Sequence, residues 1–394
     1  MSDDLAPNYI IEIAGQELKS DVTQFIKRVE YESADGMIDQ AKIVASNPNY
    51  LLSSARVFAP GNEMEIYMGY GAARVRLIGR VVLLKPMPRF PKDGMPVLEI
   101  TGYTKSYLMK EQRPETGPLP SPWAKKKKKK KSQSNTVWKK VAVDEVVQEK
   151  ALAHYLAEDI DRVPGPARNV IQPARMSDYE FLQGLANMTG FSFWVDYSFD
   201  TGWTLHFKDL TKGLDSQEFQ YTFRHGQGDR TTLLSFEPEM IFKDHFTQIR
   251  VQGHIINDSG RSELVDIVIS EEKETEADLD YAGTLETLEV DPESAAAVKI
   301  FIGDYSFAVI PKIEFRNRHA MENWASQWYR RMREHFIAGE GVVPGVETLF
   351  ARQTHILEGL QPPYDGKYYF SKVRHVIDSG SGYYCEFNAR KVLQ

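Results

Sequence analysis

Positions that contain histidine or cysteine are where this sequence could do chemistry, and none of them forms a complete reactive set. His245 follows Asp244 and could take part in acid–base chemistry, but nothing nearby supplies a nucleophile or a third metal ligand, so we interpret it as a structural histidine. His206 and Asp209 lie near the end of a predicted strand and are interpreted as surface polar residues. Cys385 has alternating apolar and polar neighbours, which indicates a buried core thiol rather than an activated nucleophile.

The sequence also lacks the short motifs that mark common enzymes. It contains no GxxxxGK[ST] phosphate loop, no HExxH, no GxSxG nucleophile turn and no GxGxxG after a strand. The single cysteine excludes an internal disulfide and a two-cysteine metal site, which suits a protein folded in a reducing cytoplasm. We therefore predict that the chain is not an enzyme and holds no metal or cofactor.

The composition is that of a globular protein with room for two or three domains in 394 residues. The acidic N-terminus, Met1-Ser2-Asp3-Asp4, is followed by no apolar segment, so no secretory signal is predicted. No run of about 18 apolar residues occurs, so we expect no membrane insertion.

Charge is distributed unevenly along the chain. The net charge is −7, and seven lysines stand in a single run, so the remainder would carry −14 without them. Because phosphate attraction needs spread basic charge, such an acidic body is a poor general binder of nucleic acid.

The lysine run lies in a segment, residues 111–137, that also contains four prolines. Repelling charges and prolines predict a solvated loop. The loop could have no specific partner, or it could contact DNA, the host envelope or an acidic partner surface. The candidate contact residues are Lys125, Lys126, Lys127, Lys128, Lys129, Lys130 and Lys131.

Residues 1–104 are predicted to be β-structure. Val29 and Tyr31 alternate with charged residues, the period of a half-buried strand, and residues 39–46 are expected to return after the turn at residues 34–36. Further strands are predicted at 63–69, 75–84 and 97–103, with a long turn marked by Pro86, Pro88, Pro91 and Gly94 before the last of them.

An α/β stretch follows. A helix is expected over residues 144–156. Ser177 and Glu180 form a predicted capping box for a second helix that Gly190 ends, and residues 191–195 and 203–207 are expected to form a hairpin.

The remaining chain is predicted to be mainly β again. Residues 233–236 and 246–254 are expected to pair, and an acidic loop should follow at 271–276. A helix over 317–338 has an apolar stripe that includes Met321, Ala325 and the buried tryptophans Trp324 and Trp328. Final strands are expected near 348–356, 367–377 and 383–391.

Six segments resemble, in order, those of a known family. The N-terminal four are residues 8–15 (NYIIEIAG), 58–63 (FAPGNE) through 68–70 (MGY), 77–81 (LIGRV) and 98–103 (LEITGY). The later two are Gln172 with 177–182 (SDYEFL), Leu185 and Ala186, and 365–369 (DGKYY) with 373–375 (VRH). The ordered set is similar to the late control D family of phage tail proteins, whose fold also forms baseplate hubs and the base of type VI secretion spike proteins. Residues 111–137 and 257–312 have no good counterpart in the family pattern.

The resemblance implies a mixed β and α+β fold with two tail-tube-like β-barrel domains and intervening α/β segments. The implied domains are a first barrel at 1–110, the Pro/Lys-rich loop at 111–137, an α/β domain at 138–229, a second barrel from 230–256 and 340–394, and an insertion with the amphipathic helix at 257–339. Two barrels per chain would let a trimeric ring offer six similar surfaces, as a hub between a hexameric tube and a trimeric spike requires.

The implied function is that of a structural hub in a contractile phage-tail baseplate. Its expected partners are two further copies of itself, the tail tube protein, a separate spike protein, baseplate wedge proteins, and tape measure protein or DNA passing through the channel. The expected location is the virion, after assembly in the host cytoplasm. An acidic channel lining would repel passing DNA. Alternatives are the hub of a tailocin or type VI-like machine, a tail-tip cell-wall hydrolase, and a carbohydrate-binding receptor module.

Overall fold

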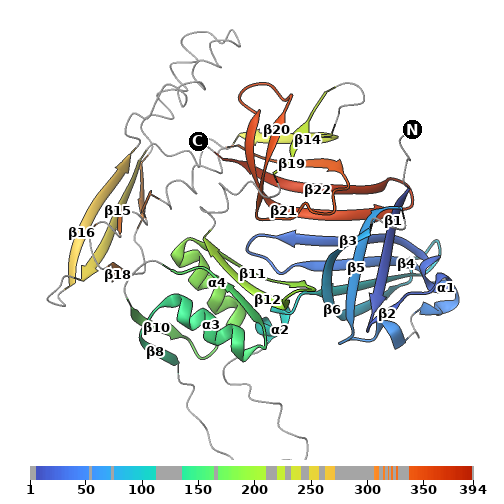
Figure 1. Ribbon diagram of the computed structural model, residues 1–394, viewed down its shortest axis with the longest axis horizontal. Coiled ribbons are helices and arrows are strands. Elements are labelled where there is room, and N and C mark those ends of the chain that lie inside the picture. Colours follow the sequence, from blue (N-terminus) through green and yellow to red (C-terminus); the bar gives the residue numbers. More distant parts are fainter. Residues whose placement is uncertain are drawn as a thin grey trace, which may run out of the picture. The chain divides into compact units, whose positions relative to one another are not determined.

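The protein is described by a computed structural model, shown in Figure 1. The described residues are 6–392, apart from gaps at 53–55, 72–74, 112–134, 164–166, 210–219, 227–231, 241–247, 257–261, 271–305, 310–313, 316–317, 319–320, 323–324 and 327–336. The chain divides into two compact units. Unit 1 contains Met1–Leu210, Gly345–Ala351 and Lys372–Cys385, and unit 2 contains Thr211–Pro344, Arg352–Ser371 and Glu386–Gln394.

The first part of unit 1 is an antiparallel sheet with the strand order β21-β3-β4-β7-β6-β5-β1-β2. Its strands are β1 (Pro7–Ile13), β2 (Gln16–Glu17), β3 (Ile26–Ala34), β4 (Gln40–Ser46), β5 (Glu63–Tyr70), β6 (Val75–Arg89), β7 (Val97–Tyr103) and β21 (Gly366–Asp378). The short helices α1 (Ser20–Thr23), η1 (Pro48–Tyr50) and η3 (Arg56–Phe58) connect them. The strands predicted for residues 1–104 are therefore confirmed.

Alternation decides which side of this sheet is buried. Val29, Tyr31, Ile43 and Ile100 face the core and are at most 3% exposed. This packing explains why residue 79 is a glycine. A Cβ atom on Gly79 would lie 2.2 Å from Cε2 of Tyr31, so only glycine leaves room for that ring.

The predicted turn at Pro86 and Pro88 is wrong, because both prolines lie inside β6. Pro86 is opposite Ile100 and Pro88 is opposite Leu98. Strand β6 pairs with β5 only up to Val82, so beyond that residue one side of β6 has no paired strand among the described residues. Proline nitrogens carry no hydrogen, and in two alternate residues they can both face that side. No hydrogen bond between paired strands is then lost.

The second part of unit 1 is the α/β region. It contains α2 (Ser106–Glu111), β8 (Thr136–Val141), α3 (Val143–Ala153), β9 (Ala157–Ile160), β10 (Arg168–Gln172), α4 (Asp178–Thr189), β11 (Phe191–Ser198) and β12 (Gly202–Asp209). Helices α3 and α4 lie beside the sheets β8–β10 and β11-β12-β9 (Figure 1), and the apolar faces meet in one core that includes Val146, Leu182, Phe193 and Leu205.

The predicted capping box and hairpin of this region are confirmed. The Ser177 side chain accepts a hydrogen bond from the Glu180 backbone N–H at 3.2 Å, and the Ser177 backbone N–H donates to the Glu180 carboxylate at 3.0 Å. Gly190 ends α4 in the left-handed conformation, with φ 83°. The two interactions begin the helix and the glycine ends it, both where the sequence indicated.

Unit 2 contains two groups of strands. The first comprises β13 (Thr222–Arg224), β14 (Ser235–Met240), β19 (Ile337–Pro344), β20 (Gln353–Glu358) and parts of β21 and β22 (Gly382–Lys391). The second comprises β15 (Gln248–Ile256), β16 (Ser262–Ser270), β17 (Ser306–Val309) and β18 (Glu314–Phe315). The fold is therefore β-rich with an α/β part, as predicted, and no sheet of the described residues closes on itself.

The predicted pairing of residues 233–236 with 246–254 is wrong. Strand β14 pairs along its whole length with β19, which is about a hundred residues later in the chain, and β15 pairs with β16. The prediction paired the strands that are nearest in sequence. In the structure, pairing brings buried residues opposite one another, as with Val251 and Ile267.

Two other C-terminal predictions are changed or only partly described. The strand predicted at 348–356 begins at Gln353, because Arg352 adopts a left-handed conformation with φ 71°. The predicted helix at 317–338 is helical at the described residues between 318 and 326, where Met321 and Ala325 of the stripe are fully buried, but its predicted end is wrong because Ile337 and Ala338 belong to strand β19. Trp324 and Trp328 lie outside the described residues.

Candidate functional site: a charged sheet face

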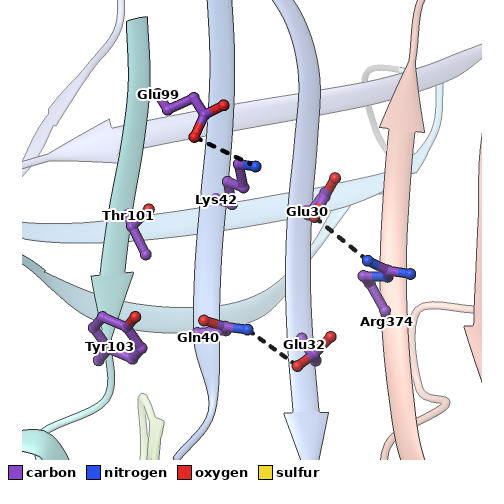
Figure 2. Close-up of a pocket in the computed structure, with 8 residues that line it drawn as sticks. All are labelled: Glu30, Glu32, Gln40, Lys42, Glu99, Thr101, Tyr103 and Arg374. Carbon is purple, nitrogen blue, oxygen red and sulfur yellow. Dashed lines mark hydrogen bonds and ion pairs between the residues drawn. The ribbon is translucent and has the colours of Figure 1, made fainter. Parts of the chain in front are cut away.

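The solvent side of the sheet in unit 1 carries a concentrated set of charged side chains, which we call the polar face. Four neighbouring strands, β21, β3, β4 and β7, direct alternate residues to this side (Figure 2). The side chains surround a shallow hollow of about 330 Å³. Its lining consists of Glu30, Glu32, Gln40, Lys42, Glu99, Thr101, Tyr103 and Arg374.

Glu99 binds two cations on the polar face. Nε of Arg89 lies 2.6 Å from one of its oxygens, and Nζ of Lys42 lies 3.6 Å from the other. The hydrogen bond from Arg89 lowers the pKa of the Glu99 carboxyl below its ordinary value, and the charge of Lys42 acts in the same direction. The carboxylate therefore stays ionised and holds both cations.

Glu30 and Glu32 bind three further cations. Nζ of Lys372 lies 2.9 Å from Glu32, and Nη1 of Arg374 lies 3.9 Å from Glu30, which also pairs with Arg28. Gln40 adds a hydrogen bond of 3.1 Å from its side-chain amide to Glu32. Figure 2 draws the contacts of Glu30 with Arg374 and of Glu32 with Gln40.

The two kinds of charge lie at different depths. The side chains of Glu30, Glu32 and Glu99 are only 10% to 14% exposed, whereas the five cations that they bind are 34% to 57% exposed. Solvent therefore reaches a larger part of the lysine and arginine side chains than of the glutamate side chains with which they pair.

Cys385 is a buried core thiol, as predicted, but it has a histidine neighbour that the sequence analysis missed. Its sulfur lies 3.4 Å from Nδ1 of His375, which is also 2.9 Å from the Tyr383 hydroxyl. Nε2 of His375 lies 2.7 Å from the Leu349 carbonyl oxygen and donates to it, so Nδ1 is the acceptor. Cys385 and His375 lie equally far from the predicted turn near Gly380, and this spacing could have revealed the pair.

This cluster is built as core and not as a nucleophile. Cys385 and His375 are 0% exposed, so no substrate reaches them. Burial raises the pKa of the Cys385 thiol to about 12 and lowers the pKa of His375 to about 4. Both groups are therefore neutral at pH 7, the opposite of a thiolate–imidazolium pair.

His206 pairs with two aspartates rather than with Asp209. Its Nδ1 lies 2.9 Å from Asp159 and its Nε2 lies 2.9 Å from Asp196, on strands of one sheet. Burial alone would lower the pKa of His206, but the hydrogen bonds and charge of Asp196 and Asp159 raise it above its ordinary value. The arrangement cross-links β9, β11 and β12.

The other sequence candidates are not located by the structure. Lys125–Lys131, Asp244 and His245 lie outside the described residues. Within the part of the chain that is described, no three histidine, cysteine or carboxylate residues come together as a possible metal site. In that same part no helix has the length and apolar character needed to cross a membrane.

Comparison with known proteins places this architecture among tail proteins. No family model and no curated protein matches the sequence. Among solved structures, the tail protein of Neisseria meningitidis MC58 superposes with a TM-score of 0.64 at 12% identity, over 98% of this chain and 97% of that one. The 43 kDa tail protein of prophage MuSo2 from Shewanella oneidensis gives 0.61 at 10% identity, over 98% of both chains.

A secretion-system protein has the same fold. The E. coli c3393 protein, described as a type VI secretion component similar to the T4 tail proteins gp27 and gp5, gives a TM-score of 0.52 at 11% identity. The match covers 98% of this chain and 77% of that one. The first two neighbours are described as tail proteins, in agreement with the prediction of a non-enzymatic role. The chain thus has the fold of phage tail proteins and of part of this type VI secretion component.

Proposed function

We propose that the protein is the trimeric hub of a contractile phage-tail baseplate, of the late control D type. The observation that carries this proposal is the end-to-end match with the tail protein of Neisseria meningitidis MC58, which spans 98% of this chain and 97% of the other. Fold alone does not give function, and the six ordered sequence segments supply the second line of support.

The adaptor role needs two similar β-units in each chain. Both units are rich in antiparallel strands, and we propose that each is a tail-tube-like barrel in the assembled ring. The domain limits proposed from the sequence are 1–110 for the first barrel and 230–256 with 340–394 for the second. Three chains would then present six similar surfaces to a hexameric tube and a threefold face to a spike.

The proposed partners follow from that position. They are the tail tube protein, a trimeric spike protein, the surrounding wedge proteins, and the tape measure protein or DNA during passage. The proposed location is the tail baseplate of a virion, assembled in the host cytoplasm.

A hub of a tailocin or type VI-like machine is the second candidate, since the type VI secretion component has the same fold. Gene neighbourhood would separate the two candidates, since capsid and terminase genes nearby indicate a phage. A tail-tip hydrolase finds no support in the buried Cys385, which no substrate can reach.

The mass of the purified protein in solution tests the hub proposal. We expect light scattering to give about three times the chain mass of 45.0 kDa. A stable monomer across the accessible concentration range would contradict the proposal, and clearing of peptidoglycan in a gel would favour a hydrolase.

The run from Lys125 to Lys131 remains a proposed contact for an acidic partner. We expect replacement of all seven lysines by glutamine to leave the thermal midpoint and the trimer mass unchanged, because a charged solvated loop contributes little to a packed core. Pull-down of the assembled baseplate proteins by this variant should be weaker than by the unchanged protein. Loss of folding or of the trimer would show instead that the loop is structural.

A further inference from the structure

We propose that the polar face of unit 1 contacts the phosphodiester backbone of double-stranded DNA. The inference rests on the proposed function in one respect, since a hub through which DNA passes must have a surface that meets it. It goes further by naming the surface, the groups that meet the phosphates and the strength of the contact.

The first step is the layering of charge. The five cations Arg28, Lys42, Arg89, Lys372 and Arg374 are the outer groups, and the glutamates beneath them are nearly covered. Coulomb attraction depends on distance, so a phosphate at the surface is closer to the cations than to the carboxylates. The face attracts an anion although it also contains carboxylates.

The second step is the balance of charge. Five cations against three glutamates and Asp378, which is opposite Arg28 in the register of β21 and β3, leave an excess of one positive charge. Lys85 is a sixth cation, exposed and opposite Thr101 in the register of β6 and β7. The chain as a whole has a net charge of −7, so the polar face differs in sign from the protein around it. Such a local reversal directs an anionic partner to one surface.

The third step is spacing, which favours a nucleic-acid backbone over an irregular acidic protein surface. Lys372 and Arg374 are alternate residues of one strand, and alternate residues lie about 6.7 Å apart because a strand rises about 3.3 Å per residue. Each phosphate of one DNA strand advances roughly 3.4 Å along the helix axis and also turns about it, so adjacent phosphates are farther apart than this rise, at a spacing of the same order as that of alternate residues on a strand. A regular array of cations on a sheet matches a regular array of phosphates without reading bases.

The fourth step concerns strength. The glutamates hold the cations in place, so less side-chain entropy is lost when a phosphate binds. They also compete with the phosphate for each cation, because an ion pair must be weakened when a second anion approaches. The result is a weak and salt-sensitive contact, which guides DNA without retaining it.

Titration of a fluorescent mixed-sequence duplex tests the inference. All variants are made in the full chain with Lys125–Lys131 replaced by glutamine, so that the lysine run does not contribute. In the first variant Lys42→Gln, Lys372→Gln and Arg374→Gln remove three outer cations. In the second, Glu30→Gln and Glu99→Gln remove two carboxylates. The matched control, Lys19→Gln with Lys92→Gln and Lys139→Gln, removes three exposed cations elsewhere in unit 1.

The two face variants should change affinity in opposite directions. We expect roughly tenfold weaker binding at about 50 mM salt for the first variant, with a salt dependence shallower by two to three counterions, since each phosphate contact releases about 0.9 of an ion. The second variant should bind roughly tenfold more tightly, and the control should stay within about twofold. The thermal midpoint of each variant shows whether it folds. If the first variant does not fold, the affinity of the second variant for the duplex still tests the inference.

Equal affinities for both face variants and the control would overturn the inference. The inference would also be overturned if the first variant bound polyglutamate more weakly but bound DNA as tightly as before. The partner of the polar face would then be an acidic protein. The hub proposal fails on a different result, a monomeric mass, so a trimer that does not bind DNA and a monomer that does are distinguishable outcomes.

Discussion

Acidification from about pH 7.5 to about pH 5 should reduce the free energy of unfolding of unit 2 by roughly 2 kcal/mol through one residue, His355. This side chain is 0% exposed, and burial lowers its pKa from 6.5 to about 3. In the unfolded chain the histidine takes up a proton near pH 6.5, but in the folded chain it does not until near pH 3. The stability it contributes is therefore complete above pH 6.5 and is lost as the pH falls below that value.

The structure explains why His355 resists protonation. Its Nδ1 accepts a hydrogen bond of 3.1 Å from the backbone N–H of Tyr221, and aromatic rings of Phe223 and Phe370 surround it. A proton on Nδ1 would break this hydrogen bond and place a charge among those rings. No carboxylate pairs with the ring nitrogens among the described contacts.

Urea unfolding of the protein at several pH values measures this effect. His355→Gln keeps an acceptor at the position and removes the titrating group, so the free energy of unfolding of this variant should fall by roughly 2 kcal/mol less than that of the unchanged protein between about pH 7.5 and 5. The pH dependence of the free energy of unfolding of unit 1 has two sources. The pKa of His375 is lowered to about 4, whereas the pKa of His206 is raised. A raised pKa gives stability at low pH, so the two effects oppose each other. A free energy of unfolding that stays constant down to pH 5 would contradict the prediction.

Phe370→Ala is expected to destabilise unit 2 by about 3–5 kcal/mol, the usual range for loss of a buried phenylalanine ring. Phe370 is fully buried, and its ring centroid lies 4.3 Å from that of Phe387 in a stacked pair and 4.7 Å from that of His355. Removing the ring leaves a cavity that the rigid strands on either side cannot fill. The expected loss is a large part of the stability of a typical domain.

A control in the same unit separates burial from the substitution itself. Leu234→Ala removes a side chain that is 53% exposed and should change the free energy of unfolding by less than about 0.5 kcal/mol. Phe370→Leu should be intermediate, because it refills part of the cavity. Chemical denaturation followed by circular dichroism measures all three, and equal effects for the two alanine variants would contradict the assigned core.

The same sheet of unit 1 shows how one chain separates its buried and exposed polar groups. On the core side, His375, Tyr383 and Cys385 satisfy one another and stay neutral. On the other side, charged groups pair across strands and remain ionised, as the lowered pKa of Glu99 shows. The first set stabilises a single packing arrangement, and the second offers charge to a partner.

The amino-acid sequence by itself determined the local elements of this protein. The capping box at Ser177 and Glu180 and the left-handed end at Gly190 depend on residues within one helix length, so they could be predicted. The alternation around Val29 and Tyr31 likewise identified a strand and its buried side. These features follow from backbone geometry and short-range hydrogen bonds.

Only the tertiary structure decided which strands pair and which side chains meet. Strand β14 pairs with β19 rather than with its neighbour in sequence, and Pro86 is tolerated within a strand because one side of β6 beyond Val82 has no partner strand in the described part of the chain. The contact of Cys385 with His375 and the depth of Glu99 beneath Arg89 depend on register and on which face is covered. Pairing energies are similar for many apolar strands, so the choice belongs to the packing of the whole unit and not to any local pattern.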